Sequence, residues 1–142
     1  MNYWIFKCSP DKYDIGKRMK DPEPRITWLV SRYKDEIKKG DIAFIWQTGP
    51  DRGLVGAMTI DESPQLCDEI QNELQYCKEL NSGLACRATG KLIARTYLIP
   101  SSQLNEISGL EELSVFHGFQ MATNFKVTKD QGEILVKMLK VS

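Results

Sequence analysis

The chain has 142 residues, of which 42% are hydrophobic and 27% are charged, and its 19 basic and 19 acidic side chains cancel. This length fits one domain, and the composition is that of an ordinary soluble globule rather than a disordered, fibrous or coiled-coil chain. A net charge of zero argues against a broadly basic coat protein for nucleic acids.

No stretch approaches the roughly 20 apolar residues of a membrane span, and the N-terminus lacks the pattern of a signal peptide. We therefore expect a cytoplasmic protein with no membrane partner. Its four cysteines form no C-x-x-C pair, so we expect reduced thiols packed as small hydrophobes. We expect no metal and no cofactor.

The first half of the chain is rich in strand patterns. Residues 3–8 alternate, with Trp4, Phe6 and Cys8 on one face and the intervening residues on the other. We assign Trp4 and Phe6 to the core. Residues 26–31 are β-branched and aromatic and predict a second strand.

An exposed helix is predicted over residues 32–39, and a hairpin follows. Its two strands are expected at 42–47 and 54–60, joined by the turn-forming segment 48–53. Gly56, inside the return strand, indicates a bulge or a close backbone approach.

The second half mixes helices and strands. Residues 68–80 have helical spacing, and residues 84–99 predict a long strand or a hairpin bent at Gly90. Short helices are expected at 103–107 and 110–116. Thr128 and Gln131 form a capping box that starts a final helix. This order predicts one α+β domain over 1–142, with a small sheet curled into a partial barrel.

Charge is unevenly distributed along the chain. Residues 1–60 hold 11 basic and 8 acidic side chains, whereas residues 61–85 hold 1 basic and 6 acidic ones. The basic N-terminal half could contact phosphates; the candidates are Arg18, Lys20, Arg25 and Arg32.

Enzyme signatures are sparse. The single histidine, His117, lies in an aromatic segment without a nucleophile elbow, and no phosphate-binding glycine loop is present. Aromatic and amide side chains are more prominent, because Trp28 and Trp46 lie on or beside strands and amides cluster near Phe116. Aromatic walls with a few amides suit a planar heterocycle.

Three segments together resemble the EVE domain, a PUA-like domain related to YTH and ASCH domains. They are Met1–Lys7 with Ser9-Pro10-Asp11, Ile26–Trp28 through Gly40-Asp41 to Ala43–Trp46 and Gly53–Gly56, and Leu113–Phe116 with Gln120–Thr128. They occur in the family's order over nearly the whole chain, with residues 62–83 unmatched. The resemblance implies a PUA-like curled β-barrel with flanking short helices and a C-terminal helix.

The resemblance also implies a function. EVE domains are thought to bind modified bases in DNA or RNA, and the related YTH domains hold methyladenine between tryptophans. By position, Trp28 would be one wall of the pocket and Trp46 a second. The remaining residues implied by the resemblance are Lys7 and Ser9 at the rim, the backbone of Leu29 and Val30 at the base edge, and Phe116, Gln120, Thr123 and Asn124 on the C-terminal side.

Three hypotheses stay open. The leading one is a non-enzymatic module that recognises methylated or hydroxymethylated cytosine, or methyladenine, in nucleic acid, and that works with an effector protein encoded elsewhere. The second is a small hydrolase for a modified nucleoside, with Lys7 and a carboxylate or threonine as catalytic groups. The third is a protein-interaction module that uses the acidic segment 61–79.

Overall fold

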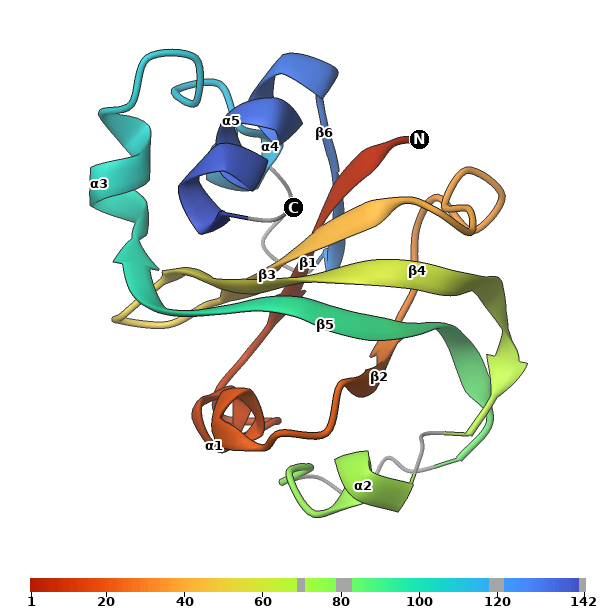
Figure 1. Cartoon of the computed structure of the whole chain (residues 1–142). Coiled ribbons are helices and arrows are strands. Elements are labelled where there is room, and N and C mark those ends of the chain that lie inside the picture. Colours follow the sequence, from red (N-terminus) through yellow and green to blue (C-terminus); the bar gives the residue numbers. More distant parts are fainter. Residues whose placement is uncertain (69–70, 79–82, 118–121, 141–142) are drawn as a thin grey trace.

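A computed structural model describes residues 1–68, 71–78, 83–117 and 122–140. In these residues strands and short helices alternate along the chain, and the longest helix comes last (Figure 1). The elements are β1 (Tyr3–Cys8), α1 (Ile15–Lys20), β2 (Arg25–Leu29), β3 (Ile42–Gln47), β4 (Gly53–Cys67), α2 (Gln71–Leu74), β5 (Ala85–Pro100), α3 (Ser101–Asn105), α4 (Ser114–His117), β6 (Asn124–Val127) and α5 (Lys129–Leu139).

The strands form one mixed sheet in the order β2-β5-β4-β3-β1-β6. The β1–β3 pair is parallel and the other pairs are antiparallel. Strands β4 and β5 are 15 and 16 residues long and their pairing shifts register at several points. Such shifts bend and twist a sheet, and the two strands accordingly sweep across the whole molecule (Figure 1).

The two edge strands are joined by a side-chain clamp, not by a strand ladder. The Asn124 side chain at the start of β6 is fully buried. Its Oδ1 accepts the Ser31 N–H at 2.8 Å, and its Nδ2 donates to the Leu29 carbonyl at 3.2 Å. The Arg32 guanidinium donates back to the Asn124 carbonyl at 2.6 Å. The sheet is thus curled but not closed, which confirms the predicted partial barrel.

Alternation along β1 separates two apolar cores. Trp4 and Phe6 belong to the cluster inside the curl, whereas Tyr3 and Ile5 belong to the cluster on the opposite face, together with Leu135 of α5. The predicted alternation of strand 3–8 and the assignment of Trp4 and Phe6 to the core are therefore confirmed.

Several other local predictions are confirmed. The hairpin of β3 and β4 forms, and a Cβ on Gly56 would lie 2.6 Å from the Ala94 carbonyl oxygen, so this backbone approach requires glycine. The segment 84–99, predicted as a long strand or a bent hairpin, is one long strand, β5 (Ala85–Pro100). The capping box is present, with Thr128 and Gln131 satisfying each other's backbone N–H groups.

The helix expected over residues 32–39 is wrong. Tyr33 adopts φ 60°, and turns follow it. This left-handed residue lets the Tyr33 ring pack 5.3 Å from that of Trp4, while Ile37 is buried in the inner core. Tertiary packing overrides the local helical pattern here. The helix expected over 68–80 is reduced to the four residues of α2 followed by a turn, and residues 69–70 and 79–80 lie outside the described part.

Candidate nucleic-acid interface

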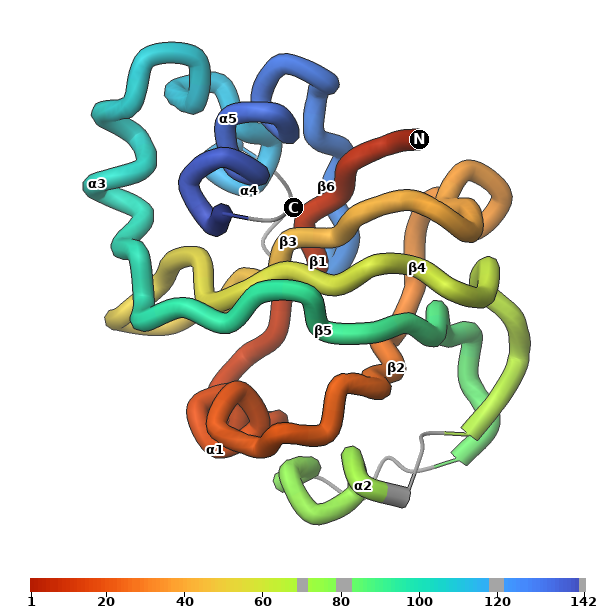
Figure 2. Tube along the Cα trace, in the orientation of Figure 1, coloured from red at the N-terminus to blue at the C-terminus, as the bar shows by residue number. Residues whose placement is uncertain are grey.

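A cleft of about 1240 Å³ lies at the C-terminal end of β1. Its walls come from β1 and β2, the loop between β3 and β4, the start of α3, α4 and the start of β6. The turn after α2 also reaches it, because the α2 segment lies against the chain around α1 (Figure 2). Segments from the whole length of the sequence therefore meet at this one place.

The cleft is more basic than the chain as a whole. Its described lining contains Lys7, Lys12, Arg52 and Arg87, along with His117, and no aspartate or glutamate. The whole chain is neutral, so the acidic side chains lie elsewhere. Low-dielectric walls lined by one sign of charge concentrate ions of the opposite sign, and this cleft is suited to a polyanion.

Trp28 lies at the floor of the cleft. Only 6% of it is exposed. The Phe6 ring stacks on it at 6.3 Å between centroids and 28° between planes, from the inner core. The Tyr13 ring meets it edgewise, at 6.3 Å and 64°. Trp28 therefore contributes both to the core and to the cleft.

Trp46 lines the same cleft but packs in a different core from Trp28. Its register partner in β1 is Lys7, and it belongs to the outer cluster, whereas Trp28 belongs to the inner one. Trp46 is 3% exposed and packs at 69° against Phe116 of α4, which also lines the cleft. Its role as a second wall of a base pocket stays a prediction.

Lys7 and Ser9 line the cleft at the end of β1, and Thr123 lines it just before β6. The Lys7 ammonium lies over the Phe125 ring at 5.3 Å, and the Arg32 guanidinium lies over the same ring at 5.2 Å. Partial burial and the neighbouring Arg32 charge lower the pKa of Lys7. The positive charge of Lys7 therefore lies at the rim, and its protonated form is less stable there than on an open surface.

The β2 end differs from the prediction. Leu29 lines the cleft and is 47% exposed, but its carbonyl already accepts a hydrogen bond from the Asn124 amide. Val30 is buried, and its N–H donates to the Cys86 carbonyl at 2.9 Å. The expectation that the Val30 backbone and the Asn124 amide face the base is wrong, because both serve the fold. Gln120 lies outside the described residues.

The four predicted phosphate contacts do not line the cleft. Arg18 is fully buried and bonded to Glu73, so it is unavailable to a phosphate and this prediction is wrong. Arg32 is engaged with Asn124 and stacked on Tyr33 and Phe125. Lys20 and Arg25 lie on other surfaces. The cations that do line the cleft are isolated in sequence, so charge clustering could not have revealed them.

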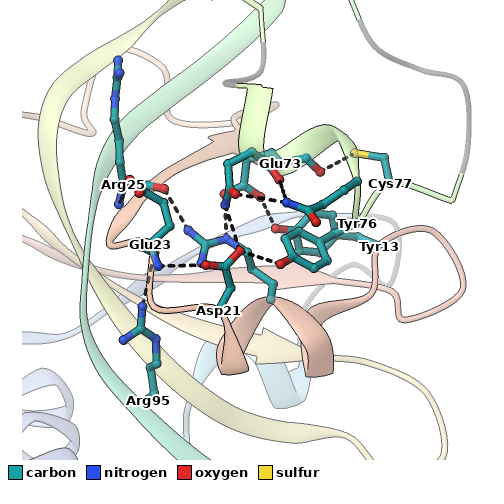
Figure 3. A network of polar contacts seen from close by, with 11 residues as sticks. Tyr13, Asp21, Glu23, Arg25, Glu73, Tyr76, Cys77 and Arg95 are labelled. Atoms are coloured by element: carbon teal, nitrogen blue, oxygen red, sulfur yellow. Dashed lines mark hydrogen bonds and ion pairs between the residues drawn. The ribbon is translucent and has the colours of Figure 1, made fainter.

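Sequence reasoning also missed a buried polar network beneath the cleft (Figure 3). The Tyr13 phenol donates to one carboxylate oxygen of Glu73, and Arg18 Nε donates to the other at 2.9 Å. Burial, and next the charge of Glu73, raise the pKa of Tyr13, so its phenol stays a donor. The partners are 55 and 60 residues apart along the chain, and no local motif signals them.

A second part of the network involves Asp21. The Tyr76 phenol donates to Asp21 Oδ2 at 2.5 Å, and this bond is the main reason why the pKa of Asp21 is lowered to about 2.

In the part of the chain described, no cluster of three or more His, Cys, Asp or Glu could hold a metal ion. No helix in that part is long and apolar enough to cross a membrane.

The family model of the EVE domain matches residues 2–138. No curated protein sequence matches the chain. Among solved structures, a hypothetical protein from Leishmania major has a TM-score of 0.67 at 14% identity, covering 99% of this chain and 95% of its own. Human THYN1, solved with DNA containing 5-methylcytosine, has a TM-score of 0.64 at 13% identity, covering 100% and 99%. The Mmi1 YTH domain has a TM-score of 0.59 at 14% identity, covering 98% and 75%.

Proposed function

Because the chain belongs to the EVE domain family, we propose that it is a non-enzymatic module that binds nucleic acid carrying a modified base. The base enters the cleft and stacks on Trp28, and it is a methylated or hydroxymethylated cytosine or a methyladenine. The observation that carries this proposal is a cleft that combines an aromatic floor with a lining of cations and no described carboxylate. The fold shared with THYN1, solved with 5-methylcytosine DNA, supports it.

The phosphate contacts are reassigned to the cleft itself. Lys12 and Arg52 both line the cleft, from the loop after β1 and from the loop between β3 and β4. Lys7, at the end of β1, lines it as well. A strand that delivers a base to Trp28 passes these side chains with its phosphates, and each phosphate neutralised releases counterions.

The hydrolase alternative would need a carboxylate and a hydroxyl beside Lys7. Thr123 is near, since its carbonyl accepts the Lys7 N–H at 2.8 Å. The described lining holds no carboxylate, so the observation that would favour a hydrolase is not present among those residues.

The test is a binding panel with the full chain. Single- and double-stranded DNA and RNA oligonucleotides would carry cytosine, 5-methylcytosine, 5-hydroxymethylcytosine, adenine or N6-methyladenine, at two salt concentrations. We expect a preference of tenfold or more for one modified base, which corresponds to about 1.4 kcal/mol. Equal binding of modified and unmodified oligonucleotides would refute base recognition.

Charge variants test the strand path separately. Lys12→Gln and Arg52→Gln should each weaken binding of every oligonucleotide and reduce the slope of log K against log salt by about 0.9 for duplex or 0.7 for single strands. Lys91→Gln is the matched control, because Lys91 is exposed on β5 and does not line the cleft. If all three variants behave alike, the strand does not follow the cleft.

A further inference from the structure

Tyr13 forms a corner with Trp28 at the floor of the cleft. It lines the cleft, and its ring stands at 64° to the indole with 6.3 Å between centroids. Phe6 covers the indole from the core at a shallow angle of 28°. A planar ligand stacked parallel to the Trp28 indole would therefore stand at a steep angle to the Tyr13 ring.

The position of Tyr13 is fixed from a distant part of the chain. Its phenol donates to Glu73, which is 1% exposed, and the other Glu73 oxygen accepts from Arg18, which is 0% exposed (Figure 3). Arg18 also donates to the Arg25 carbonyl at 2.8 Å, at the start of β2, the strand that carries Trp28. One buried ion pair thus ties both aromatic residues of the corner to a common frame.

Backbone contacts hold the same segment in place. The Asp14 N–H donates to the Tyr76 carbonyl at 2.8 Å, the Lys78 N–H donates to the Lys12 carbonyl at 2.8 Å, and Tyr13 forms an isolated β-bridge with Cys77. Residues 76–78 are therefore attached to the chain on both sides of Tyr13. Glu73 itself is buried and is not available to a protein partner.

We propose that Tyr13 is a specificity-determining residue of the base pocket, and that Glu73, through its buried pair with Arg18, is the positioning residue that holds it against Trp28. This inference rests on the proposed function. The base stacks on the Trp28 indole, and Tyr13 contacts the edge of the base that carries the modification. Segment 71–78, which carries no recognisable motif, is then part of base recognition.

The chemistry favours an apolar substituent at that edge. A methyl group set against an aromatic ring gains buried apolar surface, which is worth about fourfold in affinity per methyl group. An unmodified base lacks this contact but keeps its stacking and its phosphate contacts. Tyr13 therefore affects the ratio of the two affinities more than either affinity alone.

The experiment measures that ratio for the full chain, as the dissociation constant of an unmodified oligonucleotide divided by that of the preferred methylated one. Tyr13→Ala should lower the ratio at least about fourfold while leaving binding of the unmodified oligonucleotide nearly unchanged. Tyr13→Phe keeps the ring but loses the bond to Glu73, and should retain more of the ratio than Tyr13→Ala. Thermal unfolding of each variant identifies the temperature at which all are folded.

Tyr97→Ala is the control. It also removes a tyrosine side chain, but Tyr97 is 97% exposed on β5 and does not line the cleft. Its ratio should equal that of the wild type. If Tyr13→Ala keeps the wild-type ratio, or if Tyr97→Ala lowers it equally, the inference is overturned. A wild-type ratio of one would instead refute the proposed function itself.

Discussion

The buried pair of Arg18 and Glu73 gives a sharp stability prediction. Arg18 Nε and Glu73 Oε1 are 2.9 Å apart, and the two side chains are 0% and 2% exposed. Glu73→Ala leaves the guanidinium buried, with Nη2 donating to the Arg25 carbonyl and Nη1 lacking a hydrogen-bond partner in the described structure. An uncompensated buried charge of this kind costs about 3–5 kcal/mol.

This cost is large compared with the free energy of unfolding of the whole domain. A domain of this size is stable by roughly 5–15 kcal/mol, so Glu73→Ala should remove a third or more of the stability of an average domain. Arg18→Met alone should be costly for the converse reason, because it leaves the Glu73 carboxylate buried. The double variant Arg18→Met/Glu73→Leu removes both charges, and such replacements are often neutral or stabilising by about 1–4 kcal/mol.

Urea unfolding followed by far-ultraviolet circular dichroism would measure Glu73→Ala and the double-mutant cycle of wild type, Arg18→Met, Glu73→Leu and Arg18→Met/Glu73→Leu. We expect each single variant to lose more stability than the double variant does. The reasoning is refuted if Glu73→Ala stays within about 1 kcal/mol of the wild type, or if the effects of Arg18→Met and Glu73→Leu simply add.

Three further predictions concern the network, the last helix and the sheet. Tyr76→Phe should raise the pKa of Asp21 from about 2 toward 3.8, as measured from the carboxyl chemical shift by NMR, and an unchanged pKa would contradict the assignment. Because the pKa of Asp21 is lower in the folded state, the stability that Asp21 contributes is present above pH 3.8 and is lost as the pH falls toward 2. Thr128→Ala should cost about 1 kcal/mol in urea unfolding, since it removes a capping box, and a loss below 0.5 would show that the cap is dispensable. Gly90→Ala should cost at least about 1–3 kcal/mol, because its Cβ would lie 1.7 Å from the Thr59 carbonyl oxygen; wild-type stability would contradict this packing.

The strands could be predicted from sequence because their signals are local. Alternation in β1 and the apolar run of β3 each determine which side chains face a core, and the capping box of α5 lies within four residues. The helix prediction for segment 32–39 was wrong because the turn there depends on Tyr33 packing against Trp4, a contact that only the folded sheet creates.

The lining of the cleft was predictable only where it follows a strand. Lys7, Ser9 and Trp28 line the cleft, and strand ends and family motifs mark them in the sequence. Arg18 was misassigned because its partner is 55 residues away, and a buried arginine looks like an exposed one in sequence. Asn124 was misread in the same way, since its amide serves the clamp and not a ligand.

That clamp has a consequence for the order of folding. The contact between Asn124 and Leu29 joins residues 95 positions apart, and closing so long a loop carries an entropic cost that must be met before the contact can form. The free edge of β2 therefore stays unprotected until the strand that carries Asn124 has left the ribosome. An unprotected edge can pair with another chain, so the nascent protein stays open to misassembly at this edge until its last strand is made.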